Sequence, residues 1–160
     1  MSMQKTIAIA AAAMLLAGCQ KAEVQGGPDY PGPTEEVKLK WIEGQSKWMV
    51  QLRGQAEKEP KDAKTIIPQG ADPTMFVVNI SGHQDATFKN PGGLSVWEGE
   101  NAKSLPQQGI NSNQIIGPIV TENGRKLVFF DLNTAQVTLN YALHFNNGIP
   151  TVDPIIENNP

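Results

Sequence analysis

The strongest constraint on the fold is an alternation of apolar and polar residues that runs from Val137 to Asn146. Valine, leucine, tyrosine, leucine and phenylalanine alternate there with threonine, asparagine, alanine, histidine and asparagine. Successive side chains of a strand point to opposite faces, so this period of two predicts a half-buried β-strand. The same alternation over Val37–Trp41 and Lys47–Arg53 predicts two further strands.

Two other segments are almost continuously apolar. They are MFVVNI, at Met75–Ile80, and KLVFFDL, at Lys126–Leu132. Both are rich in β-branched and aromatic residues, which favour strands. A strand without alternation is typical of one that is covered on both faces, so we expect these two strands to be central.

Turn residues separate the apolar segments. Asn123-Gly124 lies between two apolar runs and predicts a type I′ hairpin, since both central residues of that turn need a positive φ. Asn147-Gly148 closes the alternating strand in the same way. No helical pattern longer than two turns escapes interruption by glycine or proline. The sequence therefore predicts an all-β fold, an antiparallel β-sandwich or jelly-roll-like barrel of about seven to nine strands.

The N-terminus, MSMQKTIAIAAAAMLLAGC, has the pattern of a signal peptide at Met1–Gly18. Its apolar run, Ile7–Ala17, is shorter than the roughly 20 residues that cross a bilayer. The ending LAGC matches the bacterial lipobox and predicts lipid attachment at Cys19; an ordinary signal peptide with a chance cysteine is the alternative. Cys19 is the only cysteine, so no disulfide forms within the chain. Because Gln20 replaces the aspartate that retains lipoproteins at the inner membrane, we expect an exported protein anchored at the outer membrane, facing the periplasm or the cell surface.

The rest of the chain divides into a tether and one domain. Residues 19–36 hold the lipidated cysteine and a stretch rich in glycine, proline and charge, which predicts a flexible tether. Residues 37–160 are of the size of a single domain, with the C-terminal tail included. Loss of the signal peptide removes one basic residue and changes the formal net charge from −3 to −4. Without clustered lysine and arginine, nucleic acid is not an expected partner.

The common catalytic and cofactor motifs are absent, so we expect no cofactor. His83 and Asp85 form a possible metal pair, but a metal site needs three or four ligands and we expect none. His144 falls on the polar face of its strand, where a solvated or hydrogen-bonded side chain is the simplest interpretation.

Asp131 is the acidic residue that stands out. It lies near the end of the most apolar strand, on the same face as Leu127 and Phe129. Desolvation there would raise the pKa of its carboxyl and make it a general acid near neutral pH. The alternative is an aspartate that ends the strand and starts an Asp-x-Asn turn.

The chain ends TVDPIIENNP and contains an Asp153-Pro154 bond. An Asp-Pro bond is chemically weak, because the aspartyl carboxyl attacks its own carbonyl carbon and the basic proline nitrogen leaves after protonation. A protonated carboxyl such as that of Asp131 would help by donating to this nitrogen. Asp72-Pro73 is a second bond of the same kind, so the dipeptide alone identifies no function.

Four segments resemble one family: WIEGQSKWMVQL, MFVVNISG, NQIIGPIVTENGRKLVFFDLN and VDPIIENNP. Together they are similar to the DP-EP family, small exported gammaproteobacterial proteins, over Lys38 to Pro160. The resemblance implies a β-sandwich and an aspartic-peptidase-like activity by which the protein cleaves its own C-terminal segment. For a mechanism with two carboxylates that share one proton, Asp131 and Asp85 are the candidate pair. No aspartate is followed by Thr-Gly or Ser-Gly, the signature of pepsin-like and retroviral peptidases.

Two non-catalytic interpretations stay open. In the first, the tail is a final edge strand and the protein is an envelope binding or scaffolding module. The polar stretch Gly99–Gln114 would then contact a protein partner, whose identity the sequence does not give. In the second, Trp41, Trp48 and Trp97 line a carbohydrate platform and do not belong to the core.

Overall fold

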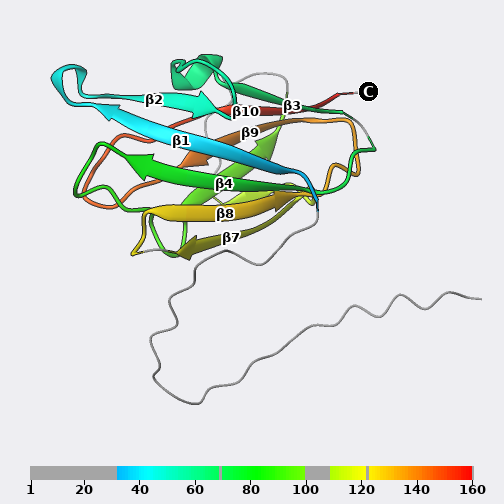
Figure 1. Cartoon of the computed structure of the whole chain (residues 1–160). Coiled ribbons are helices and arrows are strands. Elements are labelled where there is room, and N and C mark those ends of the chain that lie inside the picture. The colour runs from blue at the N-terminus through cyan, green and yellow to red at the C-terminus, as the bar shows by residue number, and fades with distance from the viewer. Residues whose placement is uncertain (1–31, 69, 100–108, 122, 160) are drawn as a thin grey trace, which may run out of the picture.

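The chain forms two β-sheets that pack face to face (Figure 1). The structure is a computed structural model, and it describes residues 32–68, 70–99, 109–121 and 123–159. The described residues form ten strands and two short 3-10 turns, and they contain no α-helix. The prediction of an all-β sandwich is confirmed.

Each sheet has five strands. Sheet A contains, in spatial order, β2 (Lys47–Leu52), β1 (Thr34–Ile42), β4 (Thr74–Ser81), β8 (Lys126–Asp131) and β7 (Ile115–Thr121). Sheet B contains β3 (Lys64–Pro68), β10 (Ile155–Asn159), β9 (Thr138–Leu143), β5 (Leu94–Glu98) and β6 (Ile110–Asn111). The 3-10 turns are Glu43–Gln45 and Pro60–Asp62. The five strands predicted from the sequence correspond to β1, β2, β4, β8 and β9.

Two details differ from the prediction. β1 begins at Thr34, so the last residues of the predicted tether, 19–36, already belong to the sheet. β4 and β8 are central, as expected, but only their inward faces are fully buried. Their outward side chains are mostly half-buried, because large apolar residues on an outer face shield one another from water without a covering layer.

The sheets are mixed, where the sequence predicted antiparallel pairing. β1 pairs with β4, β3 with β10, and β5 with β6 in parallel, while the other pairs are antiparallel. A period of two reports which face of a strand is buried and carries no information about the direction of its neighbour. The parallel pairs join strands that are distant in the chain, which no local turn signal reveals.

The two predicted Asn-Gly turns are present. Asn123 and Gly124 have φ values of 57° and 83° and connect the antiparallel strands β7 and β8. Asn147 and Gly148 have φ values of 61° and 68° and lie between β9 and the segment that leads into β10. Asparagine and glycine adopt positive φ more readily than other residues, which explains their use at both positions.

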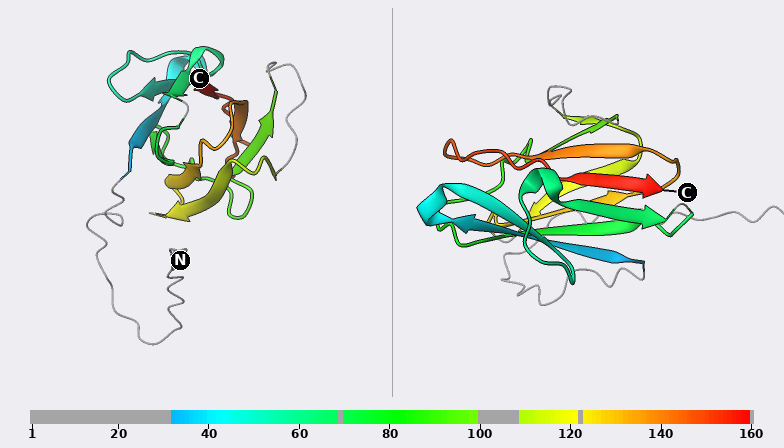
Figure 2. Two further views of the ribbon diagram at one scale, coloured as in Figure 1. Left: turned by 90° about the vertical axis from the view of Figure 1, so that its right-hand side faces the viewer. Right: turned by 90° about the horizontal axis from the view of Figure 1, so that it is seen from above.

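The C-terminal strand is an interior element of sheet B. β10 lies between β9 and β3, and its end lies beside both (Figure 2). Ile156 is completely buried, and the backbone N–H of Ile155 donates to Ala63 O at 3.0 Å. The interpretation of the tail as an edge strand is therefore wrong, and a peptide lying loosely in a groove is equally excluded in this conformation.

The core fills the space between the two sheets. Phe76 of β4 stacks on Phe129 of β8 with ring centroids 4.8 Å apart, and Tyr141 of β9 packs against Phe129 from the other sheet at 5.7 Å. Burying each side chain of this size contributes roughly 1.5–3 kcal/mol. These contacts across the sandwich fix the two sheets relative to each other.

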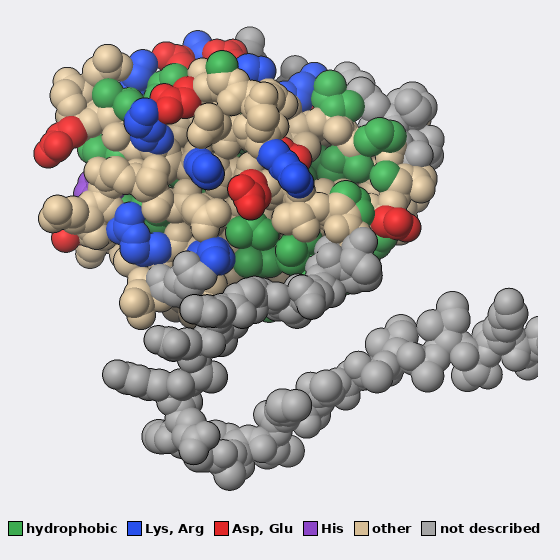
Figure 3. Space-filling view, in the orientation of Figure 1, with side chains coloured by type: hydrophobic (Ala, Val, Ile, Leu, Met, Phe, Trp, Pro, Cys, Tyr) green, Lys and Arg blue, Asp and Glu red, His purple; other side chains and the backbone are tan. Residues whose placement is uncertain are grey.

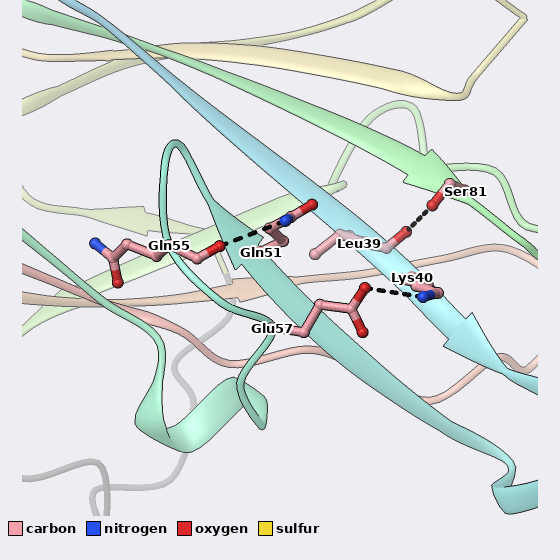
Figure 4. Close-up of polar contacts among 6 residues, drawn as sticks. All are labelled: Leu39, Lys40, Gln51, Gln55, Glu57 and Ser81. Atoms are coloured by element: carbon pink, nitrogen blue, oxygen red, sulfur yellow. Dashed lines mark hydrogen bonds and ion pairs between the residues drawn. The ribbon is translucent and has the colours of Figure 1, made fainter.

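The outer surface carries mixed charge. Basic and acidic side chains are interspersed over the face seen in Figure 3. Lys40 Nζ of β1 lies 2.8 Å from Glu57 Oε1, and Ser81 Oγ donates to Leu39 O at 3.2 Å (Figure 4). An exposed ion pair of this kind contributes at most about 1 kcal/mol. In the described part of the chain, no helix has the length and hydropathy to cross a bilayer.

Candidate functional site

Asp131 ends β8 and faces the space between the sheets, where it is completely buried. Its Oδ1 accepts hydrogen bonds from the backbone N–H of Asn133, at 3.0 Å, and from Asn158 Nδ2, at 3.3 Å. Burial raises the pKa of Asp131, and these two hydrogen bonds oppose the rise. The predicted desolvation of this carboxyl and the alternative, an Asp-x-Asn turn, are therefore both present, while its role as a general acid stays a prediction.

Asp85 lies at the other end of β8, in the loop between β4 and β5. Arg125, the residue before β8, holds that loop through Nη1, which donates to the carbonyl oxygens of Gln84 and Ala86 at 3.1 and 3.2 Å. With a rise of about 3.3 Å per residue, Asp131 lies roughly 20 Å further along the strand. The predicted pair of Asp131 and Asp85 is therefore not brought together, since an extended strand separates the two carboxyl groups.

Asp153 and Pro154 lie immediately before β10. The backbone of Val152 exchanges two hydrogen bonds with Leu143, at 2.8 and 3.2 Å, and Pro154 O accepts one from the N–H of Tyr141 at 3.3 Å. The Asp153 side chain points outward and is exposed, whereas Pro154 is buried. The Asp153-Pro154 bond is therefore held on both sides, with its carboxyl group on the outer face of sheet B.

Asp131 does not reach this bond. Its contact in the C-terminal strand is Asn158, which lies four residues beyond Pro154. That spacing corresponds to about 13 Å along an extended strand. The predicted donation from Asp131 to the nitrogen of Pro154 is thus not possible in this conformation.

His144 lies beside Asp153 on the outer face of sheet B, in a set of contacts that the sequence did not indicate. Its Nε2 is 2.8 Å from Ser95 Oγ, and its Nδ1 is 3.5 Å from Thr151 Oγ1. The backbone N–H of Gly109 donates to Ser95 Oγ at 3.2 Å, which leaves the serine hydroxyl proton available for Nε2. This arrangement favours the neutral tautomer with its proton on Nδ1.

Strand register explains how these side chains meet. Ser95 of β5 pairs with Ala142 of β9, and the pairing of Leu143 with Val152 puts Asp153 opposite Ala142 on the other side. Ser95, Ala142 and Asp153 therefore form a row across the sheet, and His144 lies two residues further along the same face. Of the two alternatives for His144, a solvated or a hydrogen-bonded side chain, the structure shows the second. Ser95 has no local signal in the sequence and becomes its partner only through the pairing of strands.

The charges of His144 and Asp153 influence each other. Burial and the Lys89 ammonium group lower the pKa of His144, while Asp153 raises it. Burial raises the pKa of Asp153, while His144 lowers it. Burial thus biases both groups toward their neutral forms, while the attraction between a charged Asp153 and a charged His144 opposes this bias.

Trp41, Trp48 and His83 pack against one another and do not form a flat exposed platform. Trp48 is buried and stacks on Phe145 at 5.0 Å, while Trp41 meets Trp48 edge to face at 68°. Trp97 is also buried. His83 packs against Trp41 with ring centroids 5.0 Å apart, and no group of three or more His, Cys, Asp or Glu side chains in the described ranges is arranged to hold a metal. Exposed coplanar tryptophans, which would mark a carbohydrate site, are therefore missing from the described residues.

Several predicted features lie wholly or partly outside the described residues. Met1–Gly18 and Cys19 are outside them, as is most of Gly99–Gln114. The end of that stretch, from Ile110 to Gln114, lines an open groove of about 750 Å³ together with residues that follow β8. The second Asp-Pro bond, Asp72-Pro73, is exposed just before β4.

No protein-family model matches the chain, and no curated protein is significantly similar to it. The two-sheet all-β fold that the resemblance to the DP-EP family implies is present.

Proposed function

We propose that this chain is a lipid-anchored envelope protein that cleaves its own backbone at Asp153-Pro154. The observation that carries the proposal is the position of the Asp153 carboxyl, which lies on an exposed face beside His144 while both flanks of the bond are held by sheet hydrogen bonds. The resemblance to the DP-EP family supports cleavage of the C-terminal segment, and the lipobox at Cys19 supports the anchor. The membrane and the protein's own C-terminal peptide are the partners of this function.

The chemistry needs one water and no second carboxylate. The Asp153 carboxylate attacks its own backbone carbonyl carbon and closes a five-membered cyclic anhydride. The bond to the Pro154 nitrogen breaks, and that nitrogen takes up a proton, for which the imidazolium of His144 is the neighbouring acid. Water then opens the anhydride, which leaves a C-terminal aspartic acid and an N-terminal proline.

Three residues have distinct roles in this mechanism. Asp153 is the nucleophile and His144 the proton donor. Ser95 is a positioning residue. Its hydroxyl binds Nε2 of His144, so the other ring nitrogen, Nδ1, points away from Ser95. Because the backbone is fixed on both sides of the bond, reaching the attacking geometry costs less entropy in the folded protein than in a free chain.

The reaction should be fastest in mild acid. The attack needs an ionised Asp153, whereas donation needs a protonated His144, so the two requirements overlap between their pKa values. The raised pKa of Asp153 and the lowered pKa of His144 narrow this interval. We therefore expect a bell-shaped dependence of the cleavage rate on pH.

Asp72-Pro73 serves as an internal control. Mass spectrometry under denaturing conditions should show loss of PIIENNP from the folded protein over days at mildly acidic pH, with little cleavage at the exposed Asp72-Pro73 bond. In denaturant the two bonds should break at similar rates, because only the fold distinguishes them. Equal rates in the folded protein, or equal loss of the tail in Asp153→Asn, would refute the proposal.

A second candidate function is protein binding through the edge strand β7. Ile116 and Ile119 of this strand are 56% and 59% exposed, and a sheet edge with exposed apolar residues accepts a strand from a partner. A photo-crosslinking residue at position 119 should then capture an envelope protein that the same residue at Ile66 does not. Ile66 is a fair control because it is 59% exposed on β3, the edge strand of sheet B.

A further inference from the structure

The end of β8 carries a group of buried oxygen atoms that lack hydrogen-bond partners among the described residues. They are Asp131 Oδ2, Asn133 Oδ1 and Asn158 Oδ1. The three residues are 0%, 4% and 2% exposed. They lie together, because the N–H of Asn133 and the Nδ2 of Asn158 both donate to the other carboxyl oxygen of Asp131.

All three free atoms are acceptors, and the amide nitrogens of Asn133 and Asn158 already donate elsewhere. Asn133 Nδ2 donates to Pro68 O at 2.7 Å, which fixes its orientation and leaves Oδ1 free. Asn158 Nδ2 donates to Asp131. Leaving a buried acceptor unpaired costs about 1–3 kcal/mol, so three of them in one place call for a ligand.

The number of free oxygens indicates what kind of ligand fits. A proton on Asp131 would satisfy Oδ2 and one amide oxygen and leave the other unpaired. One water molecule has two hydrogens and would do no better. A cation interacts with all three oxygens at once and also neutralises the carboxylate, which forms no ion pair with a lysine or arginine of the described ranges.

We propose that Asp131, Asn133 and Asn158 bind a hard, oxygen-seeking cation, Ca²⁺ or Na⁺. Carboxylate and amide oxygens are the ligands that such ions prefer. The carbonyl oxygens of Pro68 and Ala71, which accept from Asn133 Nδ2, lie beside the group and offer further ligands. Because Asn158 belongs to β10 and Asp131 to β8, the ion ties the C-terminal strand to sheet A.

This proposal does not depend on self-cleavage. Its ligands face the interior of the sandwich, about 13 Å along the strand from the Asp153-Pro154 bond. The cation site would exist in a protein that never cleaves itself, and failure of the cation test would leave the cleavage proposal standing, although the ligand Asn158 belongs to the segment that cleavage detaches.

Thermal unfolding of the purified protein tests the proposal. After dialysis against a chelator in choline chloride, the midpoint Tm is measured with increasing CaCl₂, NaCl or choline chloride. We expect a rise of about 5 °C at a concentration tenfold above the dissociation constant of the bound ion, with a further rise in proportion to the logarithm of the concentration. A response to CaCl₂ alone identifies a calcium site, and a response to NaCl alone a sodium site.

Two variants make the result specific. Asp131→Asn keeps the shape of the side chain and should lose the response, whereas Asp153→Asn removes an equal charge outside the site and should keep it. The same Tm in all salts, or an equal rise in Asp131→Asn, would overturn the proposal. If Asp131→Asn does not fold, equilibrium dialysis of the unaltered protein with radioactive calcium and ²³Na NMR decide, and binding of neither ion overturns it.

Discussion

Replacing Ile156 by alanine tests whether the last strand is an integral part of the fold. Ile156 is completely buried and belongs to the hydrophobic core between the two sheets. Removing a buried isoleucine side chain to the β-carbon costs about 2–5 kcal/mol, through lost transfer free energy and the cavity that remains. Because domains of this size are stable by about 5–15 kcal/mol, the variant should lose a large fraction of its stability.

Ile155→Ala is the matched control. Ile155 is adjacent in β10 and has the same chemistry, but it points to the outer face and is only half-buried. Its backbone pairs with β9 and β3 just as that of Ile156 does. We therefore expect a loss of about 1 kcal/mol or less, in proportion to the smaller area that it buries.

Urea unfolding followed by tryptophan fluorescence measures both variants. The fluorescence of the buried Trp48 reports the transition. An unchanged slope of the free energy of unfolding against urea concentration would show that the variants differ in stability alone. Equal losses below about 1 kcal/mol for both variants would refute the reasoning. The tail would then be a loosely attached segment, and Ile156 would not contribute to the core.

Two further predictions concern the His144 site and the turn before β8. The NMR titration of His144 should have its midpoint below the ordinary value of 6.5, and Asp153→Asn should lower it further, since Asp153 raises the pKa of the ring. The pKa of His144 is lower in the folded protein than in the unfolded chain. Its contribution to stability is therefore complete above pH 6.5 and is lost as the pH falls toward the folded pKa. His144→Gln should accordingly flatten the pH dependence of Tm in that interval. Gly124→Ala should destabilise the fold by about 1–3 kcal/mol more than Gly148→Ala, and should therefore lower Tm further. Both glycines have a positive φ, but a Cβ at Gly124 would lie 2.9 Å from Cβ of Thr87, whereas a Cβ at Gly148 would meet nothing within 4 Å. Equal effects of the two glycine substitutions would show that the contact with Thr87 relaxes freely.

The strands that the sequence predicted are those whose polar and apolar residues obey a period of two or form long apolar runs. β10 was missed as an interior strand because its inward positions combine Ile156 with Asn158. A buried asparagine reads as a solvent-facing residue in any hydrophobic pattern, so the alternation stops after Ile156. The polar side chain is buried there because it contacts Asp131, and that contact is invisible until the fold is known.

In the candidate site, too, local pattern predicted the environment of a single residue but not which residues would become its neighbours. The burial of Asp131 and the direction of its pKa shift follow from its position on the apolar face of one strand, so local pattern sufficed. Which residues would lie near it could not be predicted, because that depends on strand order and register. Asp85 was paired with Asp131 on residue type alone, while Ser95 became a neighbour of His144 through the pairing of β5 with β9.

The position of β10 also determines when the fold can be completed. Residues 155–159 supply the strand between β3 and β9, so until they are in place β3 has no partner strand in sheet B. The parallel pairing of β3 with β10 closes a loop that spans most of the domain, and such distant contacts form slowly. Sheet B therefore cannot close until residues 155–159 have docked between β9 and β3, in whatever order the other strands pair.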